Sequence, residues 1–143
     1  PGRDMVVIGI TRWTSVARYV RGEFRTQFIG MPQMNIIDTA ALPAVNAVVG
    51  AGASHDGFIG VRPENVRVRS AGEGHLHGRV DLVESLGNNT LIHANVPDSR
   101  PGGVQIVAAQ SARTQLRAGD PVGLDIVPSS FHLFNRQGQT VTL

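Results

Sequence analysis

The chain has 143 residues, 41% of them hydrophobic, which is enough for the core of one domain and too little for two large ones. It contains no cysteine, which excludes disulfide bonds, thiolate metal sites and a cysteine nucleophile. No stretch approaches the length of about 18 uninterrupted apolar residues that a membrane-spanning helix requires. The net charge is only +2 and the basic excess lies in residues 1–27, so the remainder offers no strongly basic surface. All 13 basic residues are arginines, which fits phosphate recognition or the codon usage of a GC-rich genome, and we favour the second explanation.

The first 27 residues are predicted to form a short strand followed by a helix. The apolar run at residues 4–10 (DMVVIGI) indicates the strand. Residues 14–27 indicate the helix, because Val16, Val20 and Phe24 recur near helical spacing and form one apolar stripe.

A linker and the first strand of the main domain come next. Glycine and proline interrupt any continuing helix at residues 28–35 (FIGMPQMN), so this stretch is predicted to be a linker. Ile36 and Ile37 then begin a strand. Residues 38–49 are rich in alanine and valine around Pro43, which favours a strand pair or an irregular sheet edge.

The glycine-rich stretch at residues 50–57 (GAGASHDG) is predicted to be a flexible turn. It lacks the phosphate-binding P-loop pattern, whose lysine occurs nowhere in the chain. The sequence therefore gives no indication of a nucleotide cradle here.

A strand, a turn and a second strand follow in residues 58–69 (FIGVRPENVRVR). Pro63 ends the first strand because proline cannot donate a ladder hydrogen bond. The second strand alternates valine with arginine, as a half-buried strand does. Arg62 has two interpretations: an ion pair with Glu64 that fixes the turn, which we favour, or a contact with a partner domain.

Residues 78–86 and 90–96 form the clearest predicted hairpin. Asn88 and Asn89 lie between the two runs, and asparagine tolerates the left-handed backbone angles that tight turns require. In the second run, alternate residues from Thr90 to Val96 are expected to share one face.

Strands are also predicted at residues 104–108, 121–127 and 139–143, with a turn at residues 116–120 before the second of them. The segment at residues 132–134 precedes the last of these strands. Together with 17 glycines and 8 prolines, this pattern of short strands favours a small barrel or sandwich.

The five histidines of the chain are candidate metal ligands. His75 and His77 would point to one side of a strand, and His93 or Asp98 would have to complete a site. We favour solvated histidines in a turn, and for His132 a structural ring that contacts a backbone carbonyl. No nucleophile motif such as G-x-S-x-G is present, so neither catalytic residues nor a metal site are expected.

Four stretches, in order, resemble motifs of one known family. They are residues 28–35 (FIGMPQMN), residues 60–64 (GVRPE), residues 83–90 (VESLGNNT), and residues 132–138 (HLFNRQG). The ordered set is similar to the C-terminal regulatory part, built on a TOBE domain, of the ATP-binding subunits of bacterial ABC importers for sugars and glycerol phosphate. Asn89 departs from the family, which often has glutamate there, and the region between residues 38 and 57 is unusually short.

The resemblance implies an all-β, OB-like barrel over residues 28–143, preceded by residues 1–27 as the end of an ATPase domain, or as a divergent or cloning-derived segment. It implies that ATP and Mg²⁺ belong to that ATPase domain, whose Walker and signature motifs are not in this sequence. This chain alone is therefore expected to hold no cofactor and to hydrolyse no ATP.

The resemblance also implies partners. Two such modules pair and keep the ATPase dimer together, on the cytoplasmic face of the cell membrane beside permease subunits, and a regulatory protein can dock on them. The candidate interface residues are Arg62, Glu64, Leu86, Gly87, Asn89, Phe131, His132, Leu133 and Phe134.

Two other functions are alternatives to this one. Related TOBE modules bind small oxyanions such as molybdate between paired copies. OB-like barrels often bind nucleic acids, but the seven aromatic residues and near-neutral body disfavour this.

Overall fold

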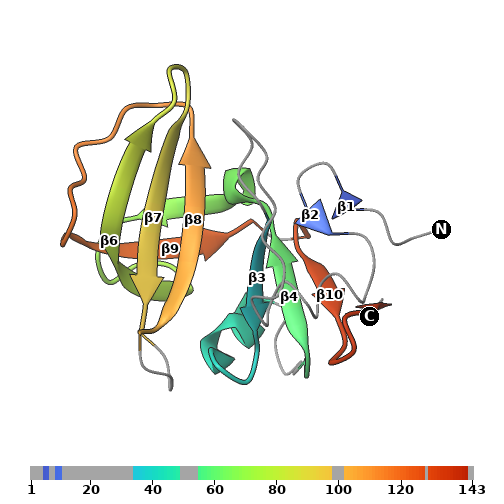
Figure 1. Ribbon diagram of the computed structural model, residues 1–143. Helices are drawn as coiled ribbons and strands as arrows, with labels where there is room; N and C mark the ends of the chain where they lie inside the picture. The colour runs from blue at the N-terminus through green and yellow to red at the C-terminus, as the bar shows by residue number, and fades with distance from the viewer. Residues whose placement is uncertain are drawn as a thin grey trace.

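The computed structural model describes residues 5–6, 9–10, 34–48, 55–97, 102–127 and 129–141. Within these ranges the chain forms strands and two short 3-10 helices (Figure 1). None of the described helices is long and apolar enough to cross a membrane. The helix predicted at residues 14–27, most of the linker and glycine-rich stretches, and Asp98 lie outside the described residues.

Four strands form one antiparallel sheet, in the order β11-β10-β4-β3. They are β3 (Asn35–Asp38), β4 (Phe58–Val61), β10 (His132–Phe134) and β11 (Thr140–Val141). The central strand β4 is buried at all four residues. It therefore has no solvent face, which explains its unbroken apolar sequence.

Five strands form the larger antiparallel sheet, in the order β5-β9-β6-β7-β8. They are β5 (Val66–Arg69), β6 (Leu76–Ser85), β7 (Thr90–Val96), β8 (Val104–Gln110) and β9 (Pro121–Ile126). Helix η2 (Pro63–Asn65) connects β4 of the smaller sheet to β5 of the larger one. Figure 1 shows the two sheets side by side, with β3 and β8 near their junction.

Strand β6 bends because it pairs with two neighbouring strands along its length. Its first half pairs with β9 and its second half with β7, and the register shifts between Val80 and Leu82. This β-bulge leaves Asp81 as the extra residue and increases the local twist. As a result Val80 and Val83 face the core, while Leu82 lies opposite His93 and is half exposed.

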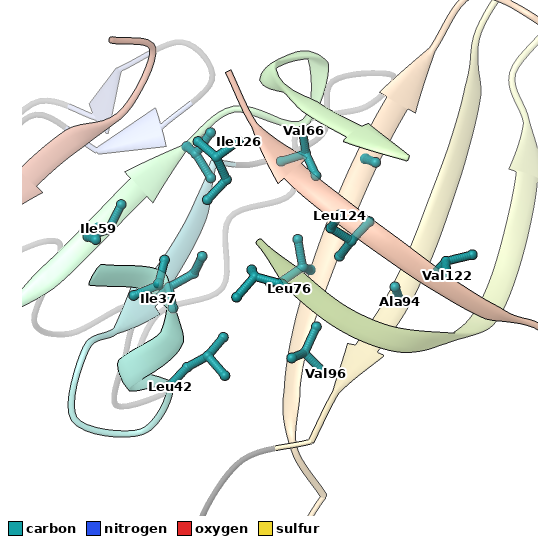
Figure 2. Packing of buried hydrophobic residues seen from close by; sticks show 14 of the residues in the cluster. Ile37, Leu42, Ile59, Val66, Leu76, Ala94, Val96, Val122, Leu124 and Ile126 are labelled. Carbon is teal, nitrogen blue, oxygen red and sulfur yellow. The ribbon is translucent and has the colours of Figure 1, made fainter. Parts of the chain in front are cut away.

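One hydrophobic cluster fills the space between the sheets (Figure 2). Ile37 and Ile59 enter it from the four-stranded sheet, and Leu76, Leu124 and Ile126 from the five-stranded sheet. Side chains from both sheets are needed to exclude water, so the two sheets form a single core. These findings confirm the prediction of an all-β, OB-like fold.

The prediction of a strand pair at residues 38–49 is wrong. Helix η1 (Pro43–Val48) occupies most of this region. Leu42, Val45 and Val48 recur every third residue and pack on the core, which is the period of a 3-10 helix rather than of a strand. The single strand predicted at residues 4–10 is also wrong, because β1 (Met5–Val6) pairs antiparallel with β2 (Gly9–Ile10).

The hairpin of β6 and β7 is confirmed, but its turn works differently. The Leu86 amide donates a 2.7 Å hydrogen bond to the Asn89 carbonyl. The positive backbone angle falls on Gly87, with φ at 83°, and on neither asparagine. Glycine adopts this conformation at no steric cost, so Gly87 sets the turn.

Candidate functional site

The predicted interface residues near the C-terminus are largely core residues. Leu133 and Phe134 in β10 are only 6% and 3% exposed, and Phe131 is half buried against the core. His132 is exposed on β10. Of this segment, only His132 is exposed in the described fold.

The other predicted interface residues lie elsewhere. Leu86, Gly87 and Asn89 are exposed in the turn between β6 and β7, at one end of the five-stranded sheet. Figure 1 shows β10 in the other sheet, well away from this turn. The structure therefore does not bring the two predicted segments together into one surface.

Two exposed apolar side chains lie on the outer side of β6 and in the turn that follows it. Leu82 is 50% exposed and Leu86 is 43% exposed, and they are the exposed large hydrophobic residues of the described chain. Between them in sequence, the Oε1 atom of Glu84 lies 2.6 Å from the Nε2 atom of His93 on β7. We call Leu82, Glu84, Leu86 and His93 the β6 patch. Leu82 was missed from sequence because the bulge reverses the expected alternation.

Arg62 does not form the predicted ion pair with Glu64. Within the described structure its Nε atom is buried and has no hydrogen-bond partner, and Glu64 is exposed. The turn is instead held by the Asn65 amide, which donates a 2.9 Å bond to the Arg62 carbonyl. An unpartnered buried guanidinium nitrogen is unusual, because such an atom loses its hydration without replacement.

The structural role expected for His132 belongs to His55. The His55 side chain is buried, with its Nε2 atom 2.8 Å from the Phe134 carbonyl oxygen. Gly57 allows this approach, because a Cβ there would collide with the same carbonyl. The sequence offered no signal for this contact, which joins residues 79 positions apart.

Arg136 joins three segments and was also missed. Its guanidinium group lies 2.7 Å from Asp38 and 2.8 Å from Asp56, and its centre is 5.3 Å from the Phe58 ring centroid. The pKa of Arg136 is raised, mainly by the hydrogen bond to Asp38. This group closes the turn between β10 and β11 onto the start of the domain.

The described histidines do not assemble a metal site. His75 contacts Asp125 at 3.0 Å, and Asp125 is also bound by Arg69 at 3.1 Å. In the described ranges no group of three or more histidine, aspartate or glutamate side chains is placed to hold a metal ion.

A nucleic-acid surface also finds little support in the described structure. Arg67, Arg69 and Arg79 are exposed, but Arg69 is paired with Glu73 and Asp125. The described phenylalanines are buried or half buried, so they provide no exposed stacking platform.

Comparisons with known proteins agree with this architecture. The family model of the TOBE domain matches residues 59–134. The maltose/maltodextrin import ATP-binding protein of Yersinia pestis is 31% identical over 139 residues, covering 84% of this chain and 36% of the relative. The sn-glycerol-3-phosphate import ATP-binding protein of Agrobacterium fabrum is 30% identical, covering 82% of this chain and 35% of the relative.

An α-glucoside transport ATP-binding protein of Rhizobium meliloti is 31% identical, covering 82% of this chain and 36% of the relative. The chain thus spans roughly a third of the length of the curated relatives it matches, which are import or transport ATP-binding proteins.

Proposed function

Because the chain belongs to the TOBE domain family, we propose that it is the regulatory and dimerisation domain of an ABC importer ATPase subunit, for a carbohydrate or glycerol phosphate. The observation that carries the proposal is the similarity to import ATP-binding proteins across more than four-fifths of the chain. The similarity extends beyond the TOBE match itself, which begins at residue 59.

In this proposal ATP and Mg²⁺ bind in an ATPase domain, and this chain contributes no catalytic group. The subunit works on the cytoplasmic face of the membrane, against permease subunits. The module holds two copies of the subunit together while the ATPase domains open and close, and it can receive a regulatory protein.

The β6 patch is the best supported surface for pairing between two copies. Leu82 and Leu86 place apolar surface on either side of the polar Glu84–His93 pair. A patch that contains both a carboxylate and an imidazole can be complementary to itself across a two-fold axis. This combination favours a second copy as the occupant.

The proposal is tested by the coding DNA upstream of Pro1. An open reading frame that continues into residue 1 and carries a Walker A motif, an ABC signature and a Walker B motif would support it. A stop codon directly upstream, or an unrelated domain in frame, would overturn the assignment to an importer ATPase.

A second candidate function, binding of a small oxyanion, is favoured by the buried Nε of Arg62. Arginine suits oxyanions because its planar donors match their geometry. Titration calorimetry with molybdate, sulfate and glycerol phosphate tests it. Heat that is present in the parent chain and lost in Arg62→Gln supports the site, whereas no heat with any of the three anions removes this candidate.

A further inference from the structure

Asn35 connects the two sheets through its side chain. It is 7% exposed in β3, the edge strand of the four-stranded sheet. Its Nδ2 atom donates to the Val61 carbonyl at 3.1 Å and to the Val107 carbonyl at 2.9 Å. Its Oδ1 atom accepts a 2.8 Å hydrogen bond from the Val107 amide. One amide group therefore makes three buried or half-buried hydrogen bonds to β4 and β8.

These bonds replace a missing strand partner. Strand β8 is an edge of the five-stranded sheet, and among the described strands it pairs only with β7, so in this part of the chain the backbone groups on its other side have no ladder partner. The Asn35 side chain offers Val107 one donor and one acceptor, as the backbone of a neighbouring strand would do. Replacing Asn35 with an apolar residue would leave both backbone groups of Val107 unsatisfied.

Asn35 also lies where the chain enters the domain. It is the last residue of the FIGMPQMN stretch and the first residue of β3. Beside it, Met34 is buried with its sulfur close to Gly60 of β4. The first residues of the described domain are therefore attached to both sheets at one point.

We propose that Asn35 is a positioning residue that couples β3 and β4 of one sheet to β8 of the other, so that the two sheets move as one rigid body. The inference concerns the internal mechanics of this chain and holds whether or not the chain serves an importer. It predicts that loss of the Asn35 contacts lets the sheets move relative to each other while the chain stays folded.

The absence of cysteine makes the test direct, since two introduced cysteines are the only sites for spin labels. Ser85→Cys on β6 and His132→Cys on β10 place one label on an exposed residue of each sheet. Double electron–electron resonance should give one narrow distance distribution in the labelled parent. Asn35→Ala should broaden it or add a second population.

Ile37→Val serves as the matched control. It removes one methyl group from a fully buried neighbour on the same strand, at a cost of about 1 kcal/mol, and leaves the Asn35 contacts intact. It should keep the narrow distribution. If Ile37→Val broadens the distribution as much as Asn35→Ala does, general destabilisation explains the effect and the inference fails.

Asn35→Asp provides a second variant with the same shape. Its ionised carboxylate would face two carbonyl oxygens, whereas its protonated form can donate one hydrogen bond again. The distance distribution should therefore be broad at neutral pH and narrow at acidic pH, while that of the parent stays narrow at both. A distribution that remains narrow in both Asn35 variants at neutral pH overturns the proposal.

Hydrogen exchange gives an independent measurement on the same proteins. The Val107 amide should exchange at least about tenfold faster in Asn35→Ala, because its acceptor is lost. The amides of Ile106 and Ala108, which face β7 in the alternating ladder, should change much less. Equal acceleration at all three amides would indicate opening of the whole strand and contradict a local role for Asn35.

Discussion

Arg136 shows how one side chain can fix the end of this domain. It follows β10 and reaches back to Asp38 at the end of β3 and to Asp56 before β4. The same guanidinium group covers the Phe58 ring. Two carboxylates and an aromatic face match the planar, delocalised charge of arginine and do not suit lysine equally well.

Arg136→Gln should lower the free energy of unfolding by about 1 kcal/mol, because it removes a partly shielded pair of charge-assisted hydrogen bonds. Urea denaturation followed by circular dichroism measures the change as a lower midpoint at constant slope. Arg67→Gln is the control: Arg67 is exposed on β5, so its loss should change stability by less than about 0.5 kcal/mol. Equal effects of the two substitutions would contradict the role given to Arg136.

The pH dependence of the Arg136 contribution follows from the direction of its pKa shift. The folded-state pKa is raised, chiefly by the hydrogen bond to Asp38. Arg136 is thus fully charged below the pKa of an unfolded arginine, and its contribution is lost only as the pH rises through the folded-state value. The difference between parent and Arg136→Gln should therefore be the same at pH values of about 6 and about 9, since arginine is charged at both.

At the scale of single elements, the turn between β6 and β7 depends on Gly87. Its φ of 83° lies in the left-handed region, and a Cβ at this position would meet no atom within 4 Å. The conformation, rather than the available space, is therefore what requires glycine here.

Gly87→Ala should destabilise the domain by about 1 kcal/mol, because alanine pays the steric cost of left-handed angles. Asn88→Ala in the same turn should cost less than about 0.5 kcal/mol, since Asn88 is exposed and has no positive φ. Thermal unfolding of both variants gives the comparison. A larger loss of stability in Asn88→Ala than in Gly87→Ala would mean that the turn depends on asparagine, as expected from the sequence, and not on Gly87.

The elements that the sequence predicted well are those whose burial appears as a local pattern, either an alternating run or an unbroken apolar run. Strands β4, β5, β7 and β9 follow from short apolar or alternating runs and from their flanking turns. The pattern failed in β6, where strict alternation places Leu82 on the same face as Val80 and the bulge reverses it. It failed again at η1, because the core-facing residues there recur with the period of three of a 3-10 helix, which neither the strand nor the α-helix period matches.

The candidate site was much less predictable because its contacts are distant in the chain. Asn35 binds Val107 across 72 positions, and Arg136 binds Asp38 across 98 positions. Single-sequence patterns report neighbours and periodicity, so they carry no signal for such pairs. The same limit explains why Leu133 and Phe134 were expected at a surface and lie in the core.

At the scale of the whole molecule, one edge of each sheet is protected by the other sheet, and the β6 patch is exposed. Strands β3 and β8 are edge strands that meet through Asn35, so neither is open at that point for pairing with another chain. Of the exposed leucines of the β6 patch, Leu82 lies instead on the outer side of a paired strand and Leu86 in the turn that follows it. We therefore expect two copies to associate through the side chains of the β6 patch rather than by strand addition at β3 or β8.

Sedimentation velocity of the 143-residue chain tests this expectation. The sedimentation coefficient should rise with protein concentration in the parent, and Leu82→Glu or Leu86→Glu should hold it at the monomer value. Each introduced carboxylate would lie beside Glu84 and would have to be desolvated in the paired state, which opposes association. The folded monomer should lose little stability, because both leucines are about half exposed.

His132→Glu is the matched control for this prediction, because it adds the same carboxylate to an exposed residue of the other sheet. It should leave the association of the parent unchanged. If His132→Glu alone prevents association, the pairing surface lies on the four-stranded sheet, and the assignment of the β6 patch is wrong. If the parent is monomeric at every concentration, the exposed leucines do not by themselves join two copies of this chain, and the dimerisation role proposed for it fails.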